Sequence, residues 1–265
     1  MELKGIFWVF SFLFGLCVGS FINVVAWRWP RGQSIIYPSS HCPKCKAKIS
    51  WFDNIPLLSY LLLRGKCRSC GEKISLRYPV IELISGLLSV LAYWCFGISI
   101  WYLIYYGFLS ALFTASIIDL EHRLIPDEIS IGGAILGVGI AFLPSHILTP
   151  LETFFGAAVG FLLIFIIAQL YYLFTKREGM GMGDAKLLGM IGAFLGWRAL
   201  GGIVFLGSLL GIIIGSVAII AQGKGRFFKI PFGPFLSFSA LIYIPVWCGK
   251  VKLPFSHFFS YLLGL

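Results

Sequence analysis

Charged residues are scarce in this chain of 265 residues, and acidic residues are the scarcer sign. Asp, Glu, Lys and Arg make up 12% of the sequence, about half the fraction carried by a soluble domain. The chain is 58% hydrophobic, which excludes an ordinary soluble fold. Several apolar runs are long enough to cross a bilayer as helices. We therefore expect an all-α polytopic membrane protein.

The sequence also lacks the motifs of several common enzyme classes. It has no Gly-x-Ser-x-Gly and no His-Glu-x-x-His, the signatures of serine hydrolases and of zinc proteases. No Gly-x-Gly-x-x-Gly follows a predicted strand, so a Rossmann-type nucleotide site is not indicated. Any hydrolytic chemistry must come from other residues.

Apolar runs bounded by polar, Gly or Pro residues predict eight membrane spans. They are 5–27, 79–98, 101–118, 129–143, 153–174, 185–197, 200–221 and 232–248. Because the runs 129–143 and 185–197 are short, re-entrant or buried helices are the alternative for them. The first run lacks a clear cleavage site, so we expect a retained span rather than a signal peptide.

The basic residues set the predicted orientation. If all eight runs cross, 17 of the 21 Lys and Arg lie on one side, and the positive-inside rule makes that side cytoplasmic. The rule also explains the net charge of +10, and no aromatic and basic platform indicates nucleic-acid binding. Membrane lipid, rather than nucleic acid, is thus the expected partner of the apolar surface. The tail 254–265 is too short to span and is predicted to lie at the interface.

These observations divide the chain into three predicted parts. Residues 1–27 form the first span, residues 28–78 form a cytoplasmic loop domain, and residues 79–265 form a helical bundle. Ten of the 21 Lys and Arg fall within 28–78.

The loop domain contains two Cys-x-x-Cys pairs separated by 21 residues, Cys42 with Cys45 and Cys67 with Cys70. This spacing is typical of a four-thiolate zinc site, and four protein ligands make the zinc structural because no position stays open for a substrate. Disulfides or unpaired thiols are the alternatives, but disulfides are rare in a reducing compartment.

Two aspartates stand at the cytoplasmic ends of apolar runs. Asp119 follows the run 101–118, at a helix C-terminus where the macrodipole disfavours an anion. Its alternative role is a solvated loop residue paired with His122 or Arg123. Nearby Asp127 precedes the next run and is predicted to be an N-cap.

Asp184 ends the run Gly179-Met-Gly-Met-Gly-Asp184. It could be an N-cap, but Gly181 and Gly183 would allow unusual backbone angles and the close approach of another peptide. Two neighbouring carboxyl groups share a proton. The ionised group can then activate water, while the protonated group assists the carbonyl oxygen and the leaving amine. Asp119 and Asp184 are therefore predicted to form an aspartyl protease pair.

In their order along the chain, these features resemble one family, the type IV prepilin peptidases, or leader peptidase/N-methyltransferases. The resemblance covers nearly the whole chain. It rests on Gly19–Val25, the two cysteine pairs, Trp51–Pro56, Arg77-Tyr78-Pro79 with Glu82, Asp119 with Ile125-Pro126-Asp127, Gly181–Lys186 and Ile230–Phe235.

The resemblance implies a multi-pass Gly-x-Gly-Asp protease of the bacterial inner membrane, with catalytic Asp119 and Asp184 facing the cytoplasm. Its substrates would be prepilins and type II secretion pseudopilins, cut after a Gly. The new N-terminal amine, usually of Phe, would then be methylated with S-adenosylmethionine. The cysteine array accompanies the methylating form of the family. The sequence assigns no residue to the methyl donor.

Two readings from other classes compete. A membrane transporter would use the acids to carry protons or cations, but it predicts acids near the bilayer midplane and paired broken helices. A zinc-knuckle membrane scaffold without catalysis would leave Asp119 and the Gly-x-Gly-Asp segment unexplained.

Overall fold

The computed structural model describes residues 2–144, 147–176, 181–222 and 231–251. Within these ranges the chain is helical and has no named strand, only two isolated bridges in the polar loop. This confirms the all-α fold. The predicted interfacial tail 254–265 lies outside the described residues.

Each of the eight predicted spans coincides with a helix. These helices are α1 (Glu2–Arg28), α3 (Arg77–Phe96), α4 (Ile100–His122), α5 (Asp127–Ile140), α6 (Pro150–Thr175), α7 (Met182–Leu195), α8 (Trp197–Gln222) and α9 (Gly233–Trp247). The polar loop adds a short helix, α2 (Leu58–Leu62), and the 3-10 turns η1 (Trp29–Arg31) and η2 (Trp51–Asn54).

Helix length separates these helices into two groups. In the described part of the chain, α1, α3, α4, α6 and α8 are long and apolar enough to cross a membrane. The chain is therefore a multi-pass membrane protein. Helices α5, α7 and α9 have only 14, 14 and 15 residues, so the count of eight crossings stays a prediction.

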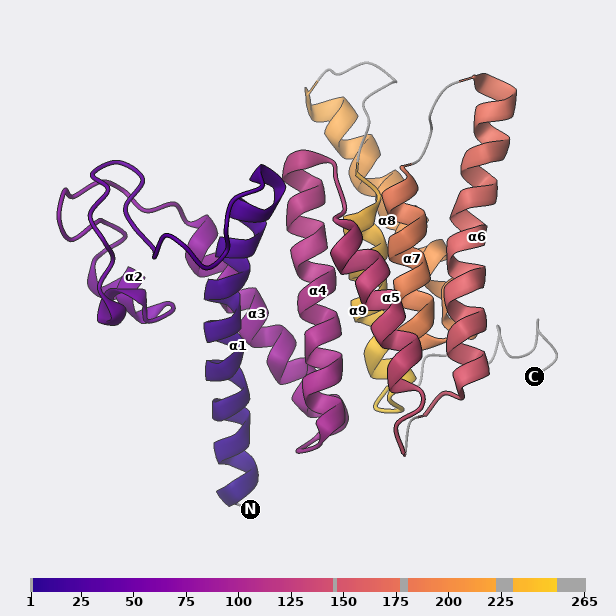
Figure 1. Ribbon diagram of the computed structural model, residues 1–265, viewed down its shortest axis with the longest axis horizontal. Coiled ribbons are helices and arrows are strands. Elements are labelled where there is room, and N and C mark those ends of the chain that lie inside the picture. Colours follow the sequence, from indigo (N-terminus) through magenta and orange to yellow (C-terminus); the bar gives the residue numbers. More distant parts are fainter. Residues whose placement is uncertain (1, 145–146, 177–180, 223–230, 252–265) are drawn as a thin grey trace. The chain divides into compact units, whose positions relative to one another are not determined.

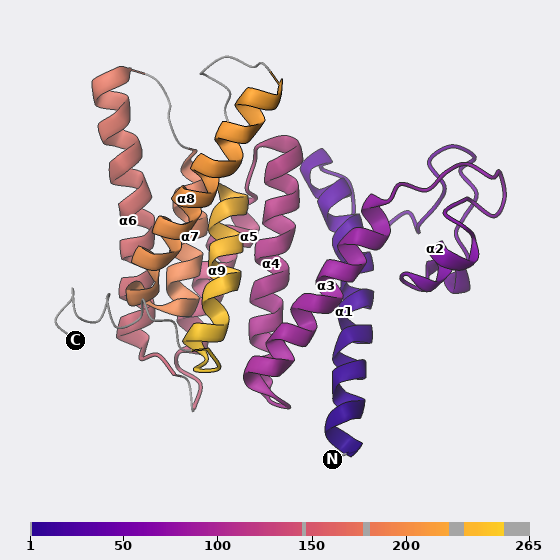
Figure 2. The same ribbon diagram turned by 180° about the vertical axis from the view of Figure 1, so that it is seen from behind.

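The contacts divide the chain into an N-terminal unit, residues 1–114, and a C-terminal unit, residues 115–265. The predicted boundaries at 27/28 and 78/79 stay predictions. In the N-terminal unit, α1 and α3 lie side by side, and the polar loop connects them (Figures 1 and 2). Tyr106 and Tyr102 of α4 bond to Ser85 and Ser89 of α3 at 2.9 and 2.7 Å.

The C-terminal unit is built around α7, which contacts α5, α6, α8 and α9. All residues from Leu187 to Leu195 are buried. Helices α6 and α7 touch through their backbones, since a β-carbon on Gly156 or Gly192 would collide with the other residue's carbonyl oxygen. Small residues permit such close packing of helices in membranes.

The helices of the C-terminal unit alternate in direction. The N-termini of α5, α7 and α9 lie at the same end of the unit as the C-termini of α6 and α8 (Figure 1). A chain that crosses a membrane repeatedly needs this alternation. It brings the first turn of α7 and the first turn of α9 to one end of the unit.

Candidate functional site

Asp119 is a buried residue in the last turn of α4, with 5% of its surface exposed. Its carbonyl oxygen accepts a hydrogen bond from the N–H of Arg123 at 2.9 Å. Its side-chain Oδ2 has no hydrogen-bond partner among the described residues. The alternative of a solvated loop residue is therefore wrong: Asp119 is a helical, buried carboxyl at an unfavourable helix end.

Asp184 lies in the first turn of α7 and is 8% exposed. The N-cap of α7 is Gly181, whose carbonyl accepts the N–H of Asp184 at 3.1 Å. Asp184 is therefore inside the helix, and the N-cap alternative for this residue is wrong. Its carboxyl group instead faces the peptide N–H of Gly181 and of Gly233.

The two carboxyl groups meet at the start of α9. The charge of Asp119 acts on Asp184, and the peptide N–H of Gly233 faces both groups. A β-carbon on Gly233 would lie 2.7 Å from Oδ2 of Asp119 and 2.9 Å from Cδ1 of Ile125. Only a glycine leaves room for the Asp119 carboxyl group in this position.

The first turn of α9 offers few other backbone donors. Pro234 has no N–H, and the N–H groups of Phe235 and Leu236 bond to the carbonyl of Phe232 at 3.0 and 3.2 Å. In this turn, the N–H of Gly233 is therefore the backbone donor that is available to the carboxyl pair. The sequence at 230–235 resembles the family pattern, but the sequence alone assigns no role to Gly233.

The predicted purposes of Gly181 and Gly183 are correct only in part. Gly181 has an ordinary extended backbone with φ of −77°, and neither glycine adopts a positive φ, so the expected unusual angles are wrong. Gly183 does permit a close approach, because a β-carbon there would lie 3.1 Å from Cβ of Ile125. The neighbour is a side chain rather than another peptide.

Asp127 is not the N-cap of α5, contrary to the sequence prediction. Pro126 occupies the cap position, its carbonyl accepts the N–H of Ser130 at 3.1 Å, and no side chain caps this helix. The Asp127 carboxylate instead pairs with Lys186 Nζ at 2.7 Å. With 58% of its side chain exposed, Asp127 differs sharply from Asp119 and Asp184.

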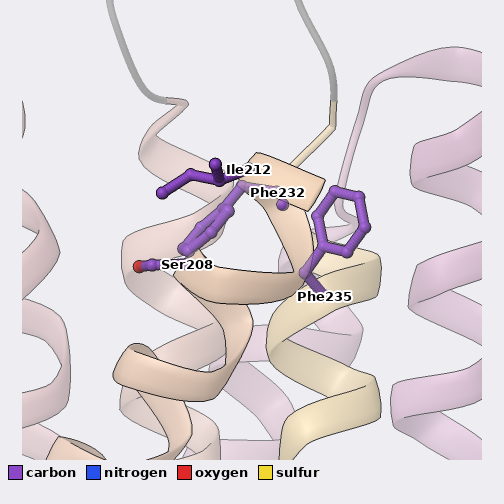
Figure 3. A pocket seen from close by; sticks show the side chains of 5 residues that line it. Ser208, Ile212, Phe232 and Phe235 are labelled. Atoms are coloured by element: carbon purple, nitrogen blue, oxygen red, sulfur yellow. The ribbon is translucent and has the colours of Figure 1, made fainter. Parts of the chain in front are cut away.

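A cavity of about 270 Å³ lies beside the same turn of α9. It is lined by Ser208, Gly211, Ile212, Phe232 and Phe235, with the two phenylalanines on either side of Gly233 in sequence (Figure 3). The lining offers no ionisable group, so this cavity adds nothing to the acid–base chemistry of the carboxyl pair.

The four loop cysteines lie together as predicted. The sulfur atoms of Cys42, Cys45, Cys67 and Cys70 are all within 4.8 Å of one another. The two pairs have matching backbones: the N–H of Lys46 bonds to the Cys42 carbonyl, and that of Gly71 bonds to the Cys67 carbonyl, both at 2.9 Å. Lys46 and Gly71 both have positive φ. Each pair is therefore a tight turn that directs two sulfurs to one point.

The cluster also has the chemistry of a metal site. The backbone N–H groups of Cys45 and Lys44 lower the pKa of the Cys42 thiol to about 6, which favours the thiolate that binds metals. At Cys70 the backbone N–H of Glu72 lowers the pKa, but burial and the neighbouring thiols outweigh it and raise the pKa to about 11, so without a metal Cys42 is the first of the two to ionise. Lys44 pairs with Glu72, so the two knuckles are also joined by an ion pair. Four converging sulfurs suit tetrahedral zinc.

Comparison with known proteins gives the same assignment along the chain. Residues 13–96 match the bacterial peptidase A24 N-terminal domain, and residues 106–216 match the type IV leader peptidase family. No solved structure matches the chain.

Several curated relatives carry the name prepilin leader peptidase/N-methyltransferase. The protein of Legionella pneumophila is 36% identical, with 87% of this chain and 88% of the relative covered. The protein of Stutzerimonas stutzeri is 35% identical over 94% and 93%. That of Myxococcus xanthus is 41% identical over 83% of this chain, which spans 65% of that relative's length. The chain belongs to the type IV leader peptidase family.

Proposed function

We propose that this chain is a prepilin leader peptidase/N-methyltransferase whose proteolysis uses Asp119 and Asp184. The observation that carries the proposal is the meeting of two buried carboxyl groups, from α4 and α7, at the N–H of Gly233. The names of the relatives support the activity.

The mechanism follows from the proximity of the two groups. Two adjacent buried carboxyl groups cannot both ionise readily, so they hold one proton between them. The ionised group takes a proton from water as the water attacks the scissile carbonyl. The protonated group bonds to the carbonyl oxygen and then gives its proton to the leaving amine. The Gly233 N–H steadies the negative charge of the pair.

The substrates are prepilins and type II secretion pseudopilins, cut after a Gly that precedes an apolar stretch. The basic side of the bundle faces the cytoplasm of the bacterial inner membrane, and both aspartates lie at helix ends on that side. A substrate with a basic leader before an apolar helix presents its cleavage site at this depth.

The N-terminal unit serves the second activity, N-methylation of the new terminus. Cys42, Cys45, Cys67 and Cys70 would hold a zinc ion, whose role would be to fix the fold of the loop rather than to bind substrate. The methyl group comes from S-adenosylmethionine.

The transporter and scaffold alternatives fit less well. A proton or cation pathway predicts acids near the middle of the membrane, but Asp119 is in the last turn of α4 and Asp184 is in the first turn of α7. A scaffold gives no reason to bury two carboxyl groups together at a glycine that a β-carbon would disrupt.

The test is cleavage of a purified prepilin by the full-length protein in detergent or liposomes. Wild type should release the leader after its Gly, as read by mass spectrometry. Asp119→Asn and Asp184→Asn should each lower the rate by roughly 10³-fold or more, as for residues of a catalytic unit. Wild-type rates in either variant would refute the carboxyl pair.

A further inference from the structure

Acidic groups in the polar loop are already paired with cations. The segment 28–78 contains two acids, Asp53 and Glu72. Arg68 Nη2 lies 2.6 Å from Asp53 Oδ1, and Lys44 pairs with Glu72. The Lys44–Glu72 pair and the Arg68 side chain are exposed, whereas only 9% of the Asp53 side chain is exposed. The next acid along the chain, Glu82 in α3, is in a different situation.

Glu82 is buried, with 8% of its surface exposed. Its Oε2 accepts the N–H of Leu57 at 2.9 Å, and the Ser20 side chain also acts on the carboxyl group. No Lys or Arg of the described chain forms an ion pair with it. A buried carboxylate without a cation is costly, so the site is suited to a positively charged ligand.

The loop segment that reaches Glu82 has a strained backbone. Leu57 has φ of 58° and ψ of −48°, and the N–H of Leu58 bonds to the carbonyl of Pro56 at 2.6 Å. This is a γ-turn of the rare, strained kind. Its N–H contact with Glu82 ties the loop between the cysteine pairs to the helices of the N-terminal unit.

A buried acceptor without a partner lies in the seam between α1 and α3, where Glu82 also lies. Asn23 is 5% exposed, and its Nδ2 donates to the carbonyls of Gly19 and Tyr78 at 3.3 and 3.2 Å. Its Oδ1 has no partner among the described residues. Gly19, one turn earlier in α1, packs on Glu82: a β-carbon there would lie 2.7 Å from the Glu82 Cα.

The seam therefore combines a carboxylate without a cation and an amide oxygen without a donor. A ligand that satisfies both must carry a positive charge and N–H donors. An ammonium group has both properties. The methionine part of S-adenosylmethionine also carries one, although the sulfonium itself has no hydrogen to donate, so the experiment has to separate the donor from the processed substrate. The processed substrate of the proposed function ends in a new N-terminal ammonium.

We propose that Glu82 and Asn23 form the binding site for this N-terminal ammonium in the methyl-transfer step, an inference that rests on the proposed function. The ammonium gives one proton to the Glu82 carboxylate, and the free amine attacks the methyl carbon of bound S-adenosylmethionine. The amine lone pair forms the new N–CH3 bond. The S–CH3 bond breaks, and its two electrons remain on the sulfur. Glu82 then returns its proton to solvent.

The test is a binding measurement without the methyl donor. Two peptides of the processed pilin N-terminus are compared, one with a free amine and one N-acetylated, by fluorescence anisotropy with the full-length protein. Wild type should prefer the free amine by at least about tenfold, the contribution of a hydrogen bond to a charged group. Glu82→Gln should abolish this preference, because Gln can still accept the Leu57 N–H but carries no charge.

Glu128→Gln is the control, since it removes the same charge from an exposed residue that lies outside the loop and its cysteine cluster. It should keep the free-amine preference. Asn23→Ala removes Oδ1 without touching the Leu57 contact and should lower the preference several-fold. The zinc content of each variant shows whether its loop is still folded. If Glu82→Gln has lost its zinc, Asn23→Ala is the variant that decides the question.

The possible outcomes distinguish a failure of this inference from a failure of the proposed methyltransferase function. An unchanged preference in Glu82→Gln overturns the inference and leaves Glu82 as an anchor for the loop. If Glu82→Gln binds S-adenosylmethionine more weakly but binds the peptides as wild type does, the inference is also overturned, because the Glu82 carboxylate then contacts the methyl donor instead of the peptide. Failure of wild type to methylate the processed peptide, by contrast, refutes the proposed methyltransferase itself.

Discussion

A β-carbon on Gly233 would lie 2.7 Å from Oδ2 of Asp119, closer than real β-carbons approach other atoms. The contact joins the first turn of α9 to the last turn of α4, two segments 114 residues apart in sequence. It makes the backbone of α9 a third side of the carboxyl pair, alongside α4 and α7.

Gly233→Ala should therefore impair proteolysis without removing either carboxyl group. Overpacking of this kind costs about 1–3 kcal/mol, and if it falls on the transition state the cleavage rate drops roughly 10- to 100-fold. The measurement is kcat and KM on a purified prepilin.

Gly211→Ala is the control for Gly233→Ala. It adds the same methyl group to a neighbouring helix, where the nearest atom would be Cδ2 of Phe235 at 3.6 Å, an ordinary contact. Its rate should stay near wild type. Equal losses in the two variants would show that α9 is merely sensitive to added volume.

Asp127→Asn should leave proteolysis nearly intact. Its carboxylate is largely exposed and paired with Lys186, and an exposed ion pair contributes about 0–1 kcal/mol. We expect a rate within about fivefold of wild type. A loss as large as that of Asp119→Asn would mean that the catalytic pair has been assigned to the wrong acids.

The four cysteines should bind one zinc ion per chain. Cys67→Ser should reduce the zinc measured by elemental analysis and weaken N-methylation, while proteolysis persists in part because both aspartates lie in the C-terminal unit. Cys17→Ser is the control, because Cys17 lies in α1 outside the cluster. Wild-type protein without bound metal, or equal loss of both activities in Cys67→Ser, would contradict this division.

The ion pair of Asp53 with Arg68 should make the loop sensitive to acid. The Arg68 side chain lowers the pKa of Asp53, so the pair stabilises the folded loop fully above the unfolded pKa of about 3.9. This stabilisation disappears as the pH falls through the lower, folded pKa. Limited proteolysis between about pH 2 and 6 should show wild type more resistant than Asp53→Asn at the upper end. At the acidic end of the range, wild type and Asp53→Asn should be equally resistant. If their resistance differs by the same amount at every pH, the Asp53 carboxylate is not the cause of the difference.

Local sequence patterns were sufficient for the helices and for the residues with distinctive chemistry. Apolar runs predicted the eight main helices, and the spacing of Cys42, Cys45, Cys67 and Cys70 predicted their cluster. Asp119 stands out in the sequence because an anion at a helix C-terminus is unfavourable. In each case the signal lies within about one helix or one turn of the residue concerned.

Roles that depend on distant contacts could not be predicted in the same way. Gly233 matters because of a carboxyl group on α4, and a glycine before a proline is otherwise an ordinary helix start. Asp127 had a good local reason to be an N-cap, but the ion pair with Lys186 of α7 took its carboxylate instead. Glu82 stood in a recognised motif, and only the fold shows that it is buried without a cation.

The backbone contact between Gly156 and Gly192 has a consequence for how the protein enters the membrane. Helix α7 is short and buried along its length by the neighbouring helices, so it presents almost no surface of its own to lipid. If α7 entered the membrane alone, the Asp184 carboxyl group in its first turn would lie in hydrocarbon or in water without a partner. Its placement therefore depends on α5 and α6 already being present, and the Asp184 carboxyl reaches Asp119 only after this late step. On the proposed function, a newly made chain would thus have no paired aspartates, and no proteolysis in the membrane, until the bundle around α7 has assembled.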